Sequence, residues 1–286
     1  MTVSPAAPVV VGVNGSPASL TAVRAAARHA QLHDAELRIV HVFNWLPTYD
    51  VHPGASAQAV LDQAVALAKD VAPGLSIRTR MLEGTPATLL LRESRMAALI
   101  AVGEGSLSRC TCPAVDACAI QVARRAWCNV LVTREHGGAD GPVVVGVDHC
   151  SDAGQVLDVG FDEAARLGTE VIAVRVVDPD ATDDEIEEEK RRLRDVIVPR
   201  ERAFAVTARP VLRWGDPTEV LRQASEGAGM VVVGAHGDRP YGGMPGSVTQ
   251  ALLHHCPAPL EVVRRQSTRP PGPRRPERVP PYTTVN

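Results

Sequence analysis

The feature that most constrains the fold of this chain is an internal repeat that covers most of its 286 residues. Four short segments recur about 130 residues further on: residues 9–14 as 143–148, 83–87 as 214–218, 98–103 as 229–234 and 130–134 as 260–264. The period is close to the length of an ordinary domain. The sequence therefore predicts two tandem domains of the same fold.

Within each copy, short apolar runs alternate with longer amphipathic segments. In the first copy we expect helices at residues 16–32, at 57–71 and from 85, and strands at residues 37–43, at 76–82, from 99 and at 130. Ser16 is placed to cap the first helix, with Pro17 at its first position. Strands that alternate with helices predict parallel βαβ units, so we expect an α/β fold with doubly wound parallel sheets.

The predicted domains are residues 1–135 and 142–264, joined by a short glycine-rich linker at residues 136–141. Residues 265–286 are rich in proline and arginine and contain almost no core-forming side chains. This composition is typical of a disordered tail. A docking peptide for a groove or an acidic partner is the alternative.

Composition limits the classes of partner. The net charge is −3, which argues against nucleic acid or a membrane surface as a partner. No apolar run approaches the length of a membrane span, and the first residues lack the basic segment that begins a signal peptide. We therefore expect a cytoplasmic protein whose six cysteines are reduced.

The most informative local pattern is a glycine-rich loop in the second copy. A buried strand ends at Val233 and Gly234, glycines follow at Gly237 and in the middle of the loop, and Gly246 opens an amphipathic helix. Glycines let a backbone approach an anion closely, and the N–H groups at a helix start suit a phosphate. An ordinary strand-to-helix turn is the alternative interpretation.

Two common nucleotide motifs are absent from this loop. It has no Gly-Lys-Ser/Thr of a Walker A motif, and it lacks the spacing of a dinucleotide fingerprint. It resembles the G-x2-G-x9-G-[ST] loop of the ATP-binding universal stress proteins. Its second gap, residues 238–245, is one residue shorter than the family's gap.

The resemblance, which covers residues 8–264, implies a tandem universal stress protein. It implies two five-stranded parallel α/β sandwiches with strand order 3-2-1-4-5. It also implies that the last strands, at residues 130–133 and 260–263, pair antiparallel as an intramolecular pseudo-dimer. That pairing would remove two open sheet edges.

The resemblance also implies a nucleotide site in the second copy. Asp148 would hold the adenosine, the backbone of Val176 would contact adenine, and the start of the last helix would cradle the phosphates. His236 either bonds a phosphate or faces solvent. The implied site residues are Val147, Asp148, Val176, Val233, Gly234, His236, Gly237, Gly246, Ser247 and Val248.

The first copy departs from this pattern. Asn14 replaces the aspartate, Ser106 stands at the second glycine, and Asp116 stands where the phosphate-binding glycine is expected. A carboxylate at that position repels an anion. Asp116 is also suited to cap the helix expected from residue 117. Either role removes the phosphate site.

The cysteines do not form a strong metal motif. Cys110, Cys112 and Cys118 lack the C-x2-C spacing of zinc sites, so we expect unreacted thiols. Cys128, Cys150 and Cys256 are typical of small buried or strand-end residues.

Two features of the second copy have structural interpretations. The charged segment 183–198 predicts a solvated helix with i,i+4 pairs from Glu187 to Arg191 and from Glu188 to Arg192. Pro210 in the third strand predicts a strand at the edge of the sheet.

Two functions remain open. The first is a non-enzymatic stress-response sensor or regulator that binds ATP, with or without Mg²⁺, in the second copy. The alternative is a nucleotide-independent scaffold for protein–protein interaction, in which both loops are eroded. The chain lacks the paired base and Mg²⁺ ligands of P-loop enzymes, so any ATP hydrolysis should be slow. A homodimer and an unidentified protein partner are compatible with both.

Overall fold

The computed structural model describes residues 7–43, 53–104, 118–134, 140–148, 153–235 and 246–264. The first half contains β1 (Val9–Val13), α1 (Pro17–Leu32), β2 (Leu37–Phe43), α2 (Pro53–Val71), β3 (Ile77–Glu83), α3 (Pro86–Glu93), β4 (Leu99–Gly103), α4 (Cys118–Arg125) and β5 (Asn129–Thr133). The second half contains β6 (Val143–Gly146), α5 (Ala153–Leu167), β7 (Val171–Val177), α6 (Asp183–Phe204), β8 (Ala208–Trp214), α7 (Pro217–Ala224), β9 (Met230–Gly234), α8 (Ser247–His255) and β10 (Leu260–Val263).

Several predictions concern residues outside the described part of the chain. They are those on Ser106, Cys110, Cys112, Asp116, Cys150, His236 and Gly237, on most of the linker and on the tail from residue 265.

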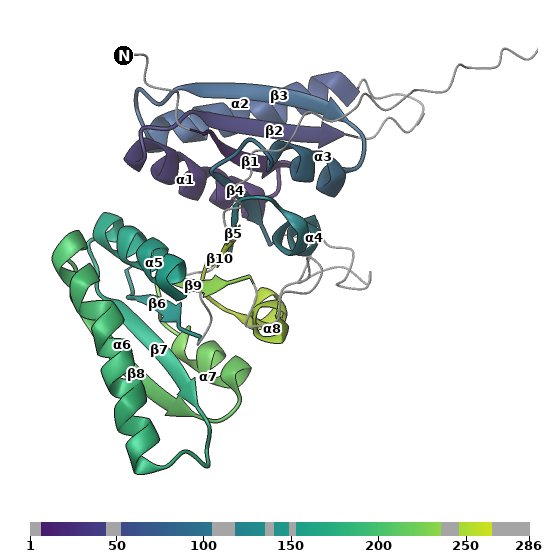
Figure 1. The fold of residues 1–286 in the computed structure, drawn as a ribbon. Helices are drawn as coiled ribbons and strands as arrows, with labels where there is room; N and C mark the ends of the chain where they lie inside the picture. The colour runs from purple at the N-terminus through teal and green to yellow at the C-terminus, as the bar shows by residue number, and fades with distance from the viewer. Residues whose placement is uncertain are drawn as a thin grey trace, which may run out of the picture.

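The strands form one ten-stranded sheet in the order β3-β2-β1-β4-β5-β10-β9-β6-β7-β8. Each half therefore has the expected order 3-2-1-4-5, and pairing is parallel within each half. At the centre β5 and β10 pair antiparallel, with Glu261 opposite Leu131 (Figure 1). The predicted pseudo-dimer through the last strands is thus confirmed. Pro210 lies in β8, which is at the end of the sheet as predicted.

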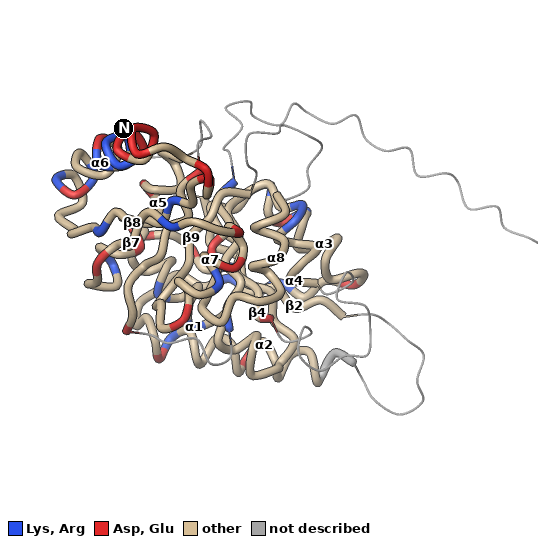
Figure 2. The backbone as a smooth tube through the Cα atoms, turned by 90° about the horizontal axis from the view of Figure 1, so that it is seen from below, with Lys and Arg blue, Asp and Glu red and all other residues tan. Residues whose placement is uncertain are grey.

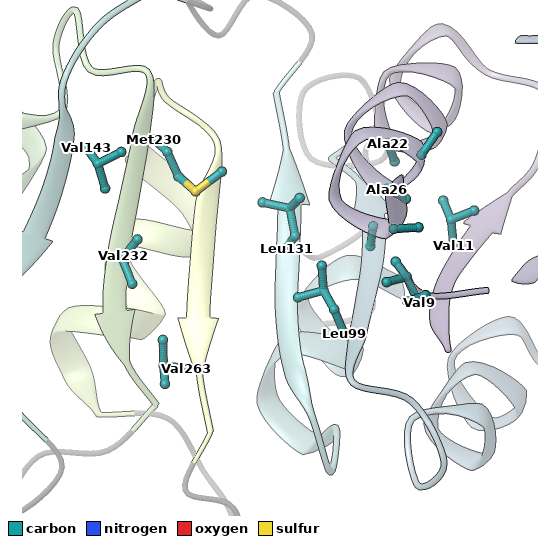
Figure 3. Close-up of a cluster of buried hydrophobic side chains, with 14 of the residues drawn as sticks. Val9, Val11, Ala22, Ala26, Leu99, Leu131, Val143, Met230, Val232 and Val263 are labelled. Carbon is teal, nitrogen blue, oxygen red and sulfur yellow. The ribbon is translucent and has the colours of Figure 1, made fainter. Parts of the chain in front are cut away.

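Helices cover both faces of the sheet because strand side chains alternate between the faces. Val9 and Val11 pack on the face that carries α1, α2, α5 and α6, whereas Val10 packs on the face of α3, α4, α7 and α8. Figure 3 shows Val9 and Val11 beside Ala22 and Ala26 of α1. Both clusters include residues of the two halves, so the core on each face of the sheet runs through the join.

The start of α1 follows the sequence. The Ser16 hydroxyl accepts a hydrogen bond from the backbone N–H of Ser19 at 3.2 Å, and Pro17 occupies the first turn. Helix α2 begins at Pro53, four residues before the expected start, and β3 is shifted by one residue from the expected strand. Such shifts of helix and strand ends are the least reliable part of a prediction from sequence.

The predicted end of α6 is wrong, because the helix continues through Pro199 to Phe204. A proline inside a helix costs about 3 kcal/mol. Here Ile197 is buried and the ring of Phe204 lies 6.0 Å from that of Phe161 in α5, so tertiary packing offsets the cost. Ala205, with a φ of 54°, then ends the helix in the left-handed conformation.

The charged face of α6 is built partly from the predicted pairs (Figure 2). Glu188 and Arg192 form the expected i,i+4 pair at 2.9 Å. Glu187 instead pairs with Lys190 at 2.6 Å, and Arg191 pairs with Glu188. Residues three and four apart are about equally close on a helix surface, so a long basic side chain can pair with a carboxylate at either spacing.

Two buried arginines hold the halves together from opposite sides of the join. Arg134, after β5, donates to the backbone oxygens of Leu252 and Leu253 in the last turn of α8 at 3.1 and 3.0 Å. Arg264, after β10, donates to the backbone oxygen of Ala123 in the last turn of α4. A cation at the carboxyl end of a helix satisfies free carbonyls and matches the helix dipole.

None of the helices in the described part of the chain combines the length and the apolar composition needed to cross a membrane.

Candidate functional site

A cavity of about 270 Å³ opens in the second half at the carboxyl ends of β6, β7 and β9. In a doubly wound sheet this is the point where the strand order reverses and where ligands bind. The N-terminus of α8 closes one side. The lining residues are Gly146, Val147, Asp148, Ala153, Val156, Val174, Arg175, Val176, Pro217, Leu221, Val233, Gly234, Gly246, Ser247, Val248 and Thr249.

The structure brings together eight of the ten residues selected from the sequence. They line this cavity from three strands and one helix: Val147, Asp148, Val176, Val233, Gly234, Gly246, Ser247 and Val248. The other two, His236 and Gly237, are outside the described residues. The Asp148 side chain is 57% exposed and is the one carboxylate among the described residues that line the cavity.

The first turn of α8 points free donors at the cavity. Gly246 is the N-cap and supplies no side chain to bond the first N–H groups of the helix. Among the described residues, no acceptor is present for the backbone N–H groups of Ser247, Val248 and Thr249. The Thr249 hydroxyl donates to the backbone oxygen of Gly234 at 2.7 Å, which ties the helix to the end of β9. An uncapped helix N-terminus carries partial positive charge and attracts anions.

Gly246 belongs to the helix start that was expected to cradle the phosphates, but its own backbone N–H is not free to do so. The backbone N–H of Gly246 donates to the backbone oxygen of Ala235 at 2.9 Å. This bond closes the loop between β9 and α8 at its base, so that N–H is already used. Gly246 therefore contributes the helix start and the open space above it, and the donors that remain are those of Ser247, Val248 and Thr249.

Arg175 is the site residue that the sequence analysis missed. It is 3% exposed, and its Nη1 donates to the backbone oxygen of Val147 at 3.2 Å. Its Nε lies 3.1 Å from the Glu189 carboxylate of α6, and its Nη1 lies 4.0 Å from Asp148. Its Nη2 is buried and has no partner among the described residues. A buried guanidinium donor without a partner lowers the stability of the fold. A hydrogen bond from such a charged donor to a ligand is stronger than one from a neutral donor.

A signal for Arg175 exists in the sequence. It interrupts the apolar run of residues 171–177, which folds as an inner strand of the sheet. An arginine is rarely buried unless its charge is paired. The charge in this strand therefore indicated a buried polar site at its carboxyl end.

The first half has a smaller counterpart of this cavity, of about 220 Å³. Asn14 lines it, but its side-chain oxygen accepts from the Ser16 backbone N–H at 3.1 Å and from the Ser16 hydroxyl at 2.7 Å. His41 takes the place of Arg175, and its Nδ1 lies 2.9 Å from the backbone oxygen of Val13. The side chains of Asn14, Ser16 and His41 are thus engaged within the protein.

The described thiols are protonated at neutral pH. Burial raises the pKa of Cys118, in the wall of the smaller cavity, to about 11. Burial raises the pKa of Cys128 to about 12 and also raises that of Cys256. Cys128 and Cys256 are buried, as predicted from the sequence. A protonated thiol is a poor nucleophile and a poor metal ligand.

The fold is an α/β fold with a cavity at the switch point of each sheet half. The model of the universal stress protein family matches residues 6–134 and 141–264. The chain therefore belongs to the universal stress protein family, whose members act in the stress response.

Relatives and a solved structure agree with this assignment. The chain is 31% identical over 290 aligned residues to universal stress protein Rv2005c of Mycobacterium tuberculosis, covering 91% of this chain and 97% of the relative. It is 27% identical to a universal stress protein of Mycolicibacterium smegmatis, covering 90% and 96%. A universal stress protein from Archaeoglobus fulgidus has the same fold, with a TM-score of 0.71 over 90% of this chain and 98% of that chain at 16% identity.

Proposed function

We propose that this protein binds ATP in the cavity of its second half and acts as a non-enzymatic sensor or regulator in the stress response. The observation that carries the proposal is the uncapped N-terminus of α8, which faces a cavity that buried Arg175 also lines. Free N–H groups at a helix start and a guanidinium charge both favour an anionic ligand.

The proposed arrangement follows from the lining. The phosphates lie at the backbone N–H groups of Ser247 and Val248, where the helix dipole favours negative charge. The adenosine lies toward Asp148 and the end of β7, where Val176 supplies backbone groups and apolar surface. The volume of about 270 Å³ is near the lower limit of roughly 300–1,000 Å³ for small-ligand pockets.

Binding without turnover fits the polar groups of the cavity. Mg²⁺ neutralises phosphate charge when it accompanies ATP, and Asp148 is the carboxylate that could reach it. Phosphoryl transfer also needs a base or a residue that orients the attacking group. We therefore propose that the site holds the nucleotide, with hydrolysis slow at most, in a protein that we expect in the cytoplasm.

The alternative is a scaffold that binds proteins without nucleotide. Two observations favour it: the loop is one residue shorter than the family pattern, and the Gly246 N–H is already bonded to Ala235. In this alternative the cavity is a remnant, and another surface carries function. Since β5 and β10 pair within the chain, a homodimer would also use another surface.

The test is to extract bound small molecules from the purified protein, identify any nucleotide, and titrate ATP into wild type and Gly246→Asp. Gly246 has a φ of −57° and a ψ of 160°, which any residue adopts. Aspartate there caps the helix and places a carboxylate at the phosphate position, so the fold stays intact. We expect wild-type binding in the micromolar range, about 8 kcal/mol, and at least a ~100-fold loss in the variant.

Gly246→Asn is the matched control. Asparagine caps the helix without a charge, so we expect it to weaken binding about tenfold, less than aspartate does. No nucleotide and no ATP binding in the wild type would favour the scaffold. Equal binding by wild type and Gly246→Asp would show that the phosphates do not bind at the start of α8.

A further inference from the structure

A second cluster of ligand-type side chains lies where the two halves meet, away from the nucleotide cavity. His29 and His33 are one turn apart on α1 of the first half, and Glu163 lies on α5 of the second half. The two helices face each other across the join (Figure 1). One ligand atom from each of the three residues lies within 4.8 Å of the other two. The cluster therefore needs both halves of the chain.

The three side chains already converge. His29 Nδ1 lies 3.0 Å from a carboxylate oxygen of Glu163, and the imidazole rings of His29 and His33 lie 4.0 Å apart. Bond lengths of about 2.0–2.2 Å to zinc place tetrahedral ligand atoms roughly 3.3 Å from one another. The existing separations therefore need only small side-chain rotations to enclose an ion.

Two carboxylates lie at the cluster itself. Asp162 is held by Arg166 through two contacts, at 2.6 and 2.9 Å, and its Oδ2 lies 3.6 Å from His33 Nε2. Glu163 is buried beside His29. A cation beside a buried carboxylate offsets the cost of burying it.

We propose that His29, His33 and Glu163 form a binding site for a borderline divalent transition metal, Zn²⁺ in the first instance, that bridges the two halves. Two imidazoles and one carboxylate are a zinc-type donor set, and a fourth position remains for water. Zinc would replace the 3.3 Å contact between Arg166 and His33 Nδ1. Arg166 keeps both bonds to Asp162, so this replacement costs it little.

The exposure of the three side chains indicates how an ion enters, and their place between the halves indicates what a bound ion does. The His33 side chain is 32% exposed, whereas those of His29 and Glu163 are 14% and 8% exposed, so the ion enters past His33. An ion held by α1 and α5 stabilises the paired state of the halves, because ligands bind the folded form.

The test is calorimetric titration of ZnCl₂ into the nucleotide-free full chain and into His29→Gln, His33→Gln and Glu163→Gln. His254→Gln is the matched control, because His254 and His255 form a second histidine pair, on α8. We expect the wild type and the control to bind one zinc equivalent that each cluster variant loses or binds at least ~10-fold more weakly. Mg²⁺, which prefers oxygen ligands, should not bind there.

Two further readouts keep the outcome clear. Zinc should raise the melting temperature of the wild type and of His254→Gln, but not that of His33→Gln, whose half-exposed position tolerates substitution. Co²⁺ in the site should absorb in the visible without sulfur charge-transfer bands. No zinc equivalent in the wild type, an equal affinity in all variants, or thiolate bands that account for the whole cobalt signal would each overturn the proposal.

Discussion

The two halves of the chain have the same backbone plan and differ in what their cavities offer a ligand. In the second half, buried Arg175 lines the cavity and its Nη2 has no partner among the described residues, and Asp148 is exposed beyond the end of β6. In the first half, His41 Nδ1 contacts the backbone oxygen of Val13, and the Asn14 side-chain oxygen accepts a hydrogen bond from the Ser16 backbone N–H. Charged side chains and free helix N–H groups therefore line the second cavity, whereas the corresponding side chains of the first half are bonded within the protein.

This difference shows which parts of a repeat the fold itself requires. Gly12 and Gly146 stand at equivalent positions, where a Cβ would lie 2.8 Å from Leu90 Cδ1 in one half and 3.1 Å from Val233 Cγ1 in the other, so that a larger residue would make these side chains shift. These close contacts are present whether or not a ligand binds. The polar residues at the strand ends contribute little to packing, so they are free to diverge when one site is sufficient.

The two arginines at the join, Arg134 and Arg264, also occupy equivalent positions and differ in their partners. Arg134 donates to Glu104 at 2.6 Å as well as to carbonyls of α8. Arg264 reaches a carbonyl of α4, and burial lowers the pKa of its guanidinium. The paired arginine should therefore matter more to stability than its counterpart.

The largest expected effect tests this difference. Arg134→Met should lower the free energy of unfolding by about 3 kcal/mol, because it leaves Glu104 and two carbonyls without their donor. Arg264→Met should cost about 1 kcal/mol, because the charge it removes is buried without a carboxylate partner among the described residues. Urea unfolding of both variants measures the two values. Equal losses would contradict the asymmetry of the join.

A smaller effect concerns the cavities. Arg175→His makes the second half like the first, and we expect ATP affinity to fall about 30-fold, near 2 kcal/mol, through loss of a charged donor. The matched variant His41→Ala in the first half should leave ATP affinity unchanged. Calorimetry of both variants decides the point. A loss of affinity in His41→Ala, or none in Arg175→His, would place the nucleotide elsewhere.

The smallest effect concerns the central strand pair, where Glu261 faces Leu131. The folded state raises the Glu261 pKa above its ordinary value of 4.5. Above pH 4.5 the unfolded chain loses this proton while the folded chain keeps it, so rising pH lowers stability up to the folded pKa. Glu261→Gln removes that loss and should gain about 1 kcal/mol at pH 7 and nothing at pH 4.

Thermal unfolding of wild type and Glu261→Gln across pH 4–8 measures this difference. A gain that grows as the pH falls would have the wrong sign and would show that Glu261 is ionised in the folded protein.

The repeat and the strand pattern predicted most of the fold. Alternating apolar runs and the Ser16 cap specify local elements, and the strand order in both copies is the one that the resemblance to the universal stress proteins implied. The end of α6 was missed because packing of Ile197 and Phe204 outweighs the effect of Pro199, and such packing is not visible in local sequence.

The candidate site was predictable to the extent that it lies at strand ends. Val147, Asp148, Val176 and the start of α8 converge because carboxyl ends of parallel strands meet at one edge of the sheet. The role of Arg175 and the bond from Gly246 to Ala235 depend on distances between segments far apart in the chain. The cluster of His29, His33 and Glu163 depends on the pairing of the halves, which no short motif encodes.

The central claim is that one of the two cavities binds nucleotide. Its most direct test is the number of ATP molecules bound per wild-type chain at saturation, measured by native mass spectrometry and by calorimetry. We expect one, lost in Gly246→Asp and still one in Asp116→Gly, because Asn14 and His41 remain unchanged in the first half. Two molecules per wild-type chain, or one that survives Gly246→Asp, would contradict the claim.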